Sequence, residues 1–238
     1  MAARVLVTGA GGFIGHHMVK YLVAAGHWVR GVYINEHHVD SARNNVLIST
    51  HMLEASRMNG VSRFFFPSSA CVYPQYLQNS PDVKPLKEED ASPYDPDEGY
   101  GWEKLFTEKL CQYYYEDYGL ETRVARFHNV YGSLGSYDGG REKAPAAICR
   151  KVALAKPGDE IEVWGDGLQT RSFMHIDDCT EGVYRLMHSE YCQPLNLGTD
   201  RLVTIDGLVD IVCAERPVNV VKARHAGFQA VVFIVILA

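Results

Sequence analysis

Short apolar runs alternate with amphipathic stretches through the first half of the chain. The runs predict buried strands at Arg4–Thr8, Trp28–Tyr33, Ser62–Pro67 and Glu121–Phe127. The stretches predict helices up to Ala25 and over Asn45–Asn59 and Tyr100–Tyr118. Each helix is closed by a glycine, which is the residue that most often ends a helix. Strands that alternate with helices predict a parallel sheet covered by helices.

The second half has shorter elements of both kinds. Strands are expected at Ile161–Trp164, Arg171–Ile176 and Leu195–Leu197, and helices at Pro145–Ala155, Asp178–His188 and Asp206–Cys213. We therefore predict an α/β protein with a Rossmann-like doubly wound parallel sheet in residues 1–150. A small α+β cap occupies residues 151–215, with some strands returning to the main sheet, and a divergent apolar tail occupies residues 216–238.

One long connection stands out within this pattern. Gln75–Gly99 carries four prolines among acidic residues, which predicts a long surface loop. Loops of this length are usually functional.

Composition narrows the classes of function. The chain is 47% hydrophobic and 22% charged, as in ordinary globular proteins, and its net charge of −6 gives no basis for nucleic-acid binding. Six scattered cysteines and a strand-like N-terminus favour a reducing, cytoplasmic compartment and no metal site. The apolar run Ala230–Ala238 is shorter than the about 20 residues of a membrane span, so no membrane association is expected.

A glycine-rich turn joins the first strand to the first helix. Its sequence is Gly9-Ala-Gly-Gly-Phe-Ile-Gly15. Glycines let backbone amides approach a pyrophosphate, and the helix N-terminus favours its negative charge. A tight structural turn is the alternative, but the strand before and the helix after it favour dinucleotide binding.

An acidic residue about 20 positions further on is expected to hold the ribose of such a cofactor. The second strand ends instead in Val32-Tyr33-Ile34-Asn35-Glu36, with Tyr33 where the acid is expected. Glu36 either takes its place or is a solvated loop charge, and both interpretations stay open.

Polar groups with catalytic potential gather after the third strand and on the following helix. Ser68-Ser-Ala-Cys-Val-Tyr-Pro74 lies at a strand's carboxyl end, where open α/β sheets bind ligands. Tyr100 and Lys104 are four residues apart and share a helix face. We expect Lys104 to lower the pKa of the Tyr100 phenol, which would suit proton removal from an alcohol, with Ser69 bonding the same substrate oxygen. Such a spacing also occurs by chance.

Cys71 and Lys143 each have two interpretations. Cys71 is either a small buried apolar residue, the commoner fate of such a thiol, or a reactive thiolate favoured by a nearby cation. Lys143 precedes a predicted helix, where a cation opposes the helix dipole. That position favours a ligand role, and a solvated lysine is the alternative.

Five stretches together resemble the extended short-chain dehydrogenase/reductases that act on nucleotide sugars, the NAD-dependent epimerase/dehydratase family. They are Thr8–Gly15, Ser68–Pro74, Tyr100–Lys104, Arg126–Gly132 and Trp164–Phe173. Within that family the chain most resembles the GDP-mannose 3,5-epimerases, through Ser-Ala-Cys-Val-Tyr-Pro74 and Gly139-Gly-Arg-Glu-Lys-Ala-Pro145. The resemblance covers residues 1–34 and 44–213.

The resemblance implies a cofactor, a substrate and a set of roles. NAD would accept hydride from C4 of the hexose while Tyr100 takes the hydroxyl proton, helped by Lys104 and Ser69. The resulting ketone acidifies the hydrogens at C3 and C5, where Cys71 would remove a proton from one face and Lys143 deliver one to the other. The substrate would be GDP-mannose or a related nucleotide sugar, and a homodimer is implied.

The resemblance also assigns the binding positions. Those for NAD are Gly9, Gly11, Gly12, Phe13, Ile14, Gly15, Tyr100 and Lys104. Those for the substrate are Ser69, Ala70, Cys71, Asn129, Glu142, Lys143, Ala144, Lys151, Gln169, Thr170 and Arg171.

Two departures from the family pattern carry a prediction. The Tyr33–Asn44 link is too short for the strands and helices that the family has there, so roughly 50 residues are missing, more than one unit of about 30 residues. The pattern also stops near Glu215, which leaves the cap incomplete. We expect weak NAD binding and low stability. A 4-epimerase, a 4,6-dehydratase and a non-catalytic remnant that binds nucleotide or partners are the alternatives.

Overall fold

A computed structural model describes residues 2–32, 41–78, 85–96, 98–140, 142–216 and 220–225 of the chain. Tyr33, Glu36 and the apolar run from Ala230 therefore lie outside the described residues. The described residues form two compact units. The first holds the residues up to His128 with Asp177–Gly198, and the second holds Asn129–Ile176 and the residues from Thr199. The domain boundaries predicted from the sequence stay a prediction.

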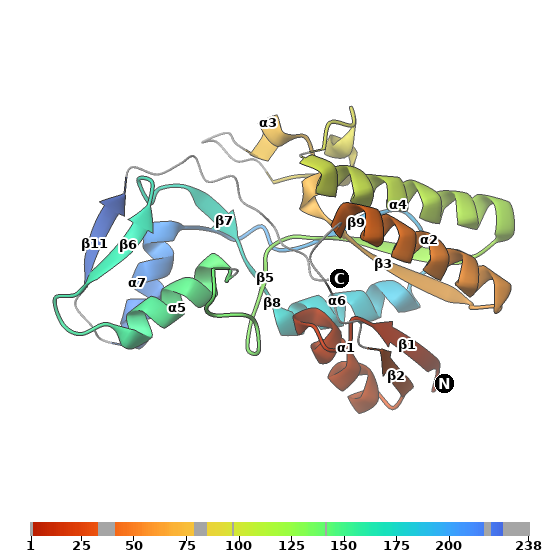
Figure 1. The fold of residues 1–238 in the computed structure, drawn as a ribbon, viewed down its shortest axis with the longest axis horizontal. Coiled ribbons are helices and arrows are strands. Elements are labelled where there is room, and N and C mark those ends of the chain that lie inside the picture. The colour runs from red at the N-terminus through yellow and green to blue at the C-terminus, as the bar shows by residue number, and fades with distance from the viewer. Residues whose placement is uncertain are drawn as a thin grey trace. The chain divides into compact units, whose positions relative to one another are not determined.

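The first unit begins with a small parallel sheet. Strand β1 (Arg4–Thr8) pairs in parallel with β2 (Trp28–Val32), and helix α1 (Phe13–Ala24) connects them. Both strands are half exposed, and Leu6 and Trp28 expose 54% and 55% of their surface. Figure 1 shows this βαβ unit as a separate red body beside α6.

A second parallel sheet carries the strand ends of interest. Its order is β3-β4-β9, from β3 (Arg63–Ser69), β4 (Glu121–Phe127) and β9 (Leu195–Leu197). Ser69 is level with Phe127, which in turn is level with Leu197, so all three strands end at one edge. Among the described residues no strand joins β1 to β3.

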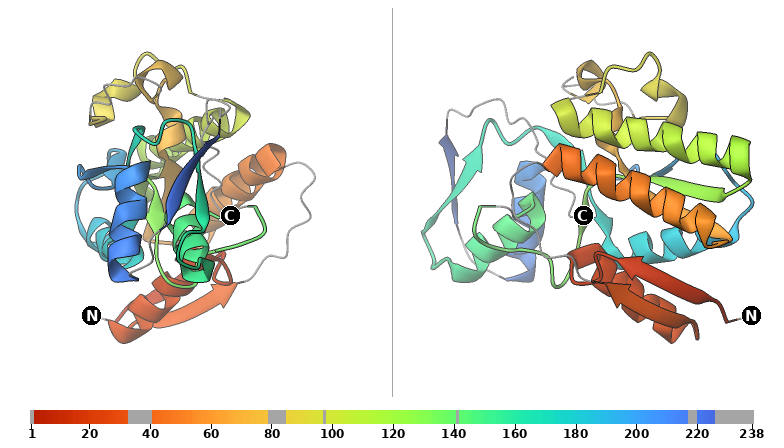
Figure 2. Two further views of the ribbon diagram at one scale, coloured as in Figure 1. Left: turned by 90° about the vertical axis from the view of Figure 1, so that its left-hand side faces the viewer. Right: turned by 45° about the vertical axis from the view of Figure 1, so that its right-hand side comes forward.

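Two long helices pack on this sheet. Figures 1 and 2 show α2 (Ser41–Met58) and α4 (Glu98–Tyr118) lying side by side. Leu53 of α2 and Cys111 of α4 meet Phe66 of β3 and Val124 of β4 in one buried cluster. This cluster fixes α4, and so the side chains at its start, against the carboxyl half of β3.

Helix α6 (Ile176–His188) ties the rest of the unit together. Arg63 at the start of β3 donates to the Met187 carbonyl (2.7 Å) at the end of α6. The Tyr21 hydroxyl of α1 donates to Glu181 of α6. The β1–β2 sheet thus contacts the remainder of the unit through side chains of α6, with no described strand pairing between the two sheets.

The connection from β3 to α4 is more structured than the long surface loop that its prolines predict. It holds the 3₁₀ turn η1 (Ala70–Val72), the short helix α3 (Gln75–Gln78) and the 3₁₀ turn η2 (Glu88–Ala91). Ala91 and Pro96 are buried, and Pro96 pairs with Pro74 in an isolated β-bridge. The described part of the connection therefore packs over the end of β3.

The described residues of the second unit form three short strand pairs and two helices. Antiparallel β7 (Thr170–Ser172) and β10 (Leu202–Thr204), parallel β6 (Glu160–Trp164) and β11 (Val221–His225), and parallel β5 (Val130–Tyr131) and β8 (Met174–His175) make up the pairs. Helices α5 (Ala144–Leu154) and α7 (Ile205–Glu215) bury Ile148 and Val209 against Ile161 of β6.

One sequence prediction needs correction in this unit, and one predicted segment contains an additional strand. A single strand over Arg171–Ile176 is wrong, because pairing passes from β10 to β5 at Phe173 and splits it into β7 and β8. The residues after 216 also contribute β11, which pairs with β6 and forms a Lys222–Asp210 ion pair (2.6 Å). The α/β class and the partial parallel sheets are confirmed.

Candidate active site

The glycine-rich turn has the geometry that its sequence predicts. Gly9 has φ of 68°, and its carbonyl accepts from the Gly12 N–H (2.9 Å). A Cβ at Gly15 would lie 2.1 Å from the Gly9 carbonyl oxygen, so only glycine lets the first turn of α1 close onto β1. Gly12 caps α1 without a side-chain hydrogen bond. No capping side chain therefore competes with an anion for the first amides of α1.

Ser69 ends β3 and holds the following turn. Its side chain is fully buried, and its Oγ accepts from the Cys71 backbone N–H (3.2 Å), which caps η1. Cys71 is partly exposed. Strand β3 runs through Ser69 rather than ending at Pro67, because Ser69 pairs in register with Phe127.

Tyr100 and Lys104 share one face of α4, as their spacing predicts. The Lys104 Nζ lies 5.4 Å from the centre of the Tyr100 ring and 5.0 Å from that of Phe66, and it donates to the Pro67 carbonyl (3.0 Å). The Tyr100 hydroxyl is buried and has no hydrogen-bond partner among the described residues. A phenol, an ammonium group, Ser69 and Cys71 thus gather at the carboxyl end of β3.

The electrostatics of this cluster differ from the sequence prediction. Burial raises the pKa of Tyr100, and the charges of Cys71 and Glu103 raise it further. The nearby Ser69 side chain only partly opposes them, because its contact with the phenol does not reach hydrogen-bond geometry. Burial lowers the pKa of Lys104 to about 8, against the opposing effect of nearby acidic groups that include Glu103. The prediction that Lys104 lowers the phenol's pKa is wrong for the protein alone, because burial is the largest influence on it and Lys104 is not among the groups that shift it.

A buried ion pair that the sequence did not single out lies beneath the cluster. Arg126 of β4 makes two hydrogen bonds to Glu108 of α4 (3.0 and 2.8 Å), and Ser68 of β3 donates to the same carboxylate. Arg126 also donates to the Tyr73 hydroxyl (3.1 Å). The network joins α4 to β3 and β4 near Ser69. In the sequence, its only sign is that Glu108 and Arg126 have apolar neighbours.

Asn196 of β9 joins the same network to the long connection. Its Oδ1 accepts from the Tyr73 hydroxyl (2.7 Å), its backbone N–H donates to Glu88 (2.8 Å), and its Nδ2 donates to the Leu86 carbonyl (2.9 Å). The segment that precedes α4 is therefore anchored to the sheet that carries Ser69.

The remaining predicted residues lie in the second unit. Lys143 caps α5, and Ala144 begins that helix. Glu142 accepts hydrogen bonds from the Gly140 N–H (2.7 Å) and from Arg150 (3.1 Å). Its own backbone N–H has the largest effect on its pKa, and together with these two bonds it holds that pKa below the usual range. Lys143 and Cys71 thus belong to different units, and their pairing stays a prediction.

Five further predicted substrate positions lie on or near β7 and α5. Asn129 donates to the Ser172 carbonyl (3.1 Å), and Lys151 of α5 bonds the Glu162 carbonyl (3.0 Å). Gln169 donates to the Trp164 carbonyl (2.8 Å), but its buried Oε1 has no partner among the described residues. Burial lowers the pKa of the Arg171 guanidinium. Thr170 lies between Gln169 and Arg171 in the sequence and begins β7, where it is level with Thr204 of β10.

Neither a metal site nor a membrane span is found in the described part of the chain. No group of three or more His, Cys, Asp or Glu side chains is arranged to hold an ion there. No helix of those residues combines the length and the apolar character needed to cross a bilayer.

Comparison with known proteins identifies the class that this fold and this cluster define. The NAD dependent epimerase/dehydratase family matches residues 33–198, and the chain belongs to this family. It is 42% identical to GDP-mannose 3,5-epimerase 1 of Oryza sativa subsp. indica, and 40% identical to GDP-mannose 3,5-epimerase of Arabidopsis thaliana. Each alignment covers 88% of this chain and 68% of the relative.

These alignments also contain positions of the relatives that have no counterpart in this chain. They span 258 positions, whereas 88% of the 238-residue chain is about 209 residues, which leaves about 49 positions of the relative without a counterpart. That agrees with the size of the segment that the short link indicates is missing.

Solved structures share the fold at low identity. UDP-glucose 4-epimerase of Thermotoga maritima has a TM-score of 0.81 at 22% identity, covering 95% of this chain and 87% of that one. UDP-glucose 4-epimerase of Thermus thermophilus, solved in complex with NAD, has a TM-score of 0.73 at 22% identity and covers 93% of this chain and 86% of that one.

Proposed function

We propose that the chain is an NAD-dependent nucleotide-sugar epimerase of the GDP-mannose 3,5 type. The observation that carries the proposal is the gathering of Tyr100, Lys104, Ser69 and the Cys71 thiol at the carboxyl end of β3. A thiol beside the tyrosine and lysine adds a second proton-transfer group to the one that alcohol oxidation needs. The relatives at 40–42% identity support the choice of substrate.

NAD fits the residues of the glycine-rich turn. The Gly9–Gly15 turn would hold the pyrophosphate at the start of α1, where Gly12 leaves the helix amides without a capping side chain. NAD would supply a reversible acceptor for hydride from the sugar, and its positive charge would lower the pKa of the Tyr100 phenol. Phe13 and Ile14 begin α1 on the same turn.

The buried tyrosine supplies the first proton transfer. Burial keeps the phenol protonated in the protein alone, so its Oη would accept the proton of a substrate hydroxyl only once bound NAD lowers its pKa. Lys104, with its pKa lowered to about 8, holds its position through the Pro67 carbonyl. Ser69 presents its hydroxyl from the strand end to the same substrate oxygen.

Cys71 and Lys143 supply the exchange of carbon-bound protons. Cys71 removes a proton next to the transient ketone and Lys143 returns one to the opposite face, which inverts the centre. Ala70 precedes Cys71 in the same turn. Arg171 is suited to binding a phosphate of the nucleotide sugar. The residues that bind this substrate are Asn129, Glu142, Ala144, Lys151, Gln169, Thr170 and Arg171.

Deuterium exchange tests this function directly. Purified protein is incubated with NAD and GDP-mannose in heavy water, and the sugar is analysed by mass spectrometry and NMR. We expect deuterium at C3 and C5, loss of that label in Cys71→Ser, and retention of it in Cys149→Ser, a change at an exposed thiol. C4 epimerisation that survives Cys71→Ser would instead indicate a 4-epimerase.

One observation favours a second candidate function, a non-catalytic remnant. The glycine-rich turn belongs to the β1–β2 sheet, which has no described strand pairing with the sheet that carries Ser69. A remnant of this kind binds nucleotide or partners without turnover. Unlabelled GDP-mannose together with measurable nucleotide binding would support it over the epimerase.

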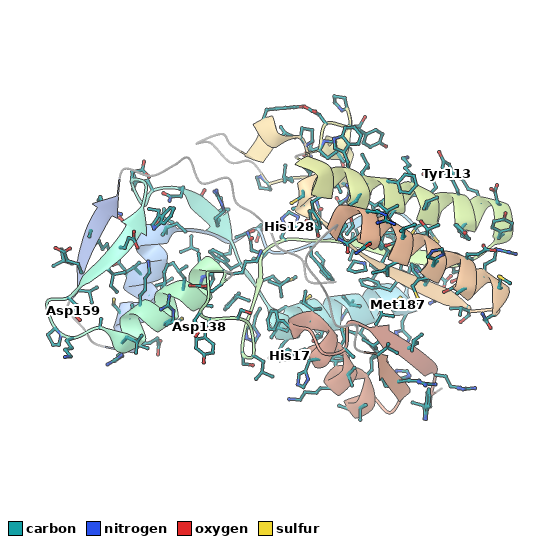
Figure 3. All side chains as sticks on the ribbon, in the orientation of Figure 1. His17, Tyr113, His128, Asp138, Asp159 and Met187 are labelled. Carbon is teal, nitrogen blue, oxygen red and sulfur yellow. The ribbon has the colours of Figure 1, made fainter. Side chains whose placement is uncertain are left out.

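The assembly and the compartment are part of the proposal. Trp102, Phe106 and Tyr113 of α4 are each about half exposed, and Figure 3 shows Tyr113 projecting from α4. An exposed aromatic stripe on a long helix suits pairing with a second copy, so we propose a homodimer. Sedimentation of Phe106→Glu should show a monomer where the unaltered protein is a dimer.

We propose a cytoplasmic location, which imaging of a tagged protein tests.

A further inference from the structure

Helix α4 approaches the Cys71 turn so closely that only glycine fits at position 101. A Cβ there would lie 2.3 Å from the Cys71 carbonyl oxygen and 2.8 Å from the Pro96 Cβ. Gly99, two residues earlier on the same helix, would meet nothing within 4 Å. The two glycines therefore differ in their surroundings although they share one helical turn, and only Gly101 is buried.

The backbone on either side of Cys71 is held at several points. Ser69 Oγ accepts from the Cys71 N–H (3.2 Å), while the start of α4 abuts the Cys71 carbonyl at Gly101. Pro96 contacts the same glycine and pairs with Pro74, three residues after Cys71. The position of the Cys71 thiol therefore depends directly on the helix that carries Tyr100.

We propose that Gly101 is a positioning residue, which sets the place of the Cys71 thiol relative to Tyr100 and Lys104. A methyl group at position 101 overlaps backbone atoms, which do not yield as a flexible side chain does. To restore ordinary contact, the Cys71 peptide and α4 must separate by about 1 Å, a displacement that can cost about 100-fold in rate when it affects a reacting group. The expected loss of catalytic rate rests on the proposed function, whereas the expected displacement of Cys71 rests on the geometry alone.

The test compares Gly101→Ala with Gly99→Ala. The first measurement is the rate of iodoacetamide alkylation at Cys71 relative to that at the exposed Cys149, by peptide mass spectrometry. We expect at least a fivefold change of this ratio in Gly101→Ala and no change in Gly99→Ala. The second measurement is epimerisation, where we expect kcat to fall about 100-fold in Gly101→Ala with KM within about threefold.

The alkylation ratio keeps the inference separate from the proposed function. If the unaltered protein turns over no GDP-mannose, the proposed function fails while the ratio still tests the placement of Cys71. An unchanged ratio and an unchanged kcat in a folded Gly101→Ala protein would overturn the inference.

A second variant covers the case in which Gly101→Ala does not fold, as shown by the lack of a cooperative melting transition. Pro96→Gly opens the same contact without adding an overlap, and we expect it too to change the Cys71 to Cys149 ratio. An unchanged ratio in Pro96→Gly overturns the inference.

In a folded double variant, Pro96→Gly should not restore the activity of Gly101→Ala, because the overlap with the Cys71 carbonyl remains. Full restoration would show that Gly101 serves the Pro96 contact rather than Cys71.

Discussion

At the scale of single residues, burial is the largest influence on the pKa values of Tyr100 and Lys104. The spacing of Tyr100 and Lys104 indicates that they meet, and they do. Spacing cannot show that the Tyr100 hydroxyl has no hydrogen-bond partner among the described residues, or that Lys104 loses its water. Those facts depend on Phe66, Pro67 and Ser69, which are more than 30 positions away in sequence. The proximity of Tyr100 and Lys104 was therefore predictable, but the electrostatics around them were not.

Tyr100→Phe should separate activity from stability. Removal of a buried hydroxyl without a partner should stabilise the fold by about 1 kcal/mol, or raise Tm by about 2–4 °C. The same change should lower epimerisation by about 100-fold or more, because the proton acceptor is gone. Calorimetry and kinetics measure the two effects, with the exposed Tyr113→Phe as a control that should change neither. A lower Tm in Tyr100→Phe would contradict this account.

Lys104 should give stability a distinctive dependence on pH. Its pKa is about 8 in the folded protein and 10.5 in the reference state, so the unfolded chain binds the extra proton between these values. Stability should therefore rise with pH from about 8 to about 10.5, by roughly 3 kcal/mol over the whole window.

Lys104→Met isolates this effect. The difference in unfolding free energy between the unaltered protein and Lys104→Met should increase with pH across that window, as measured by urea titration at each pH. Lys109→Met, on the same helix but only partly buried, serves as the control. A difference that stays flat from pH 8 to 10 would show that Lys104 is not shifted.

At the scale of elements, local patterns predicted what local forces determine. The strands at Arg4–Thr8, Glu121–Phe127 and Leu195–Leu197 have the predicted bounds. The errors arise where a distant partner decides. Phe173 interrupts a predicted strand because two different strands pair on its two sides, and β11 forms because β6 accepts it. The glycine at position 101 likewise has meaning only through the Cys71 turn.

The Glu108–Arg126 pair should behave as one unit that joins α4 to β4. Both side chains are almost fully buried. Glu108→Gln and Arg126→Met should each destabilise the protein by about 3–5 kcal/mol, because each leaves a buried group unpaired, and the double variant should cost clearly less than the sum. Urea denaturation provides the measurement. Arg57→Met, at the exposed pair with Glu54, should cost less than about 1 kcal/mol, and additivity of the buried pair would refute the coupling.

At the scale of the whole molecule, the glycine-rich turn and the proposed catalytic residues belong to different parts of the chain's sheets. The turn follows β1, and Ser69 ends β3, with no described strand between them. Sequence comparison predicted this, because the Tyr33–Asn44 link is too short for the family's further strands. How β1, β2 and α1 attach to α6 was not predictable, since that contact joins residues about 160 positions apart.

NAD should therefore bind weakly. We expect equilibrium dialysis to give a dissociation constant well above micromolar, and calorimetry to show a broad melting transition. Gly15→Ala should abolish the remaining binding, because its methyl group would overlap the Gly9 carbonyl. Micromolar affinity together with one sharp transition would contradict the prediction.

The half-exposed β1–β2 sheet sets a limit on how concentrated the protein can become. Leu6 and Trp28 face solvent on a strand pair whose β1 edge has no further partner among the described residues. Such an edge accepts a strand from another molecule, and natural sheets often guard it with a lysine. Leu6→Lys should therefore raise the soluble yield on expression while it leaves the β3-β4-β9 sheet and its catalytic cluster intact.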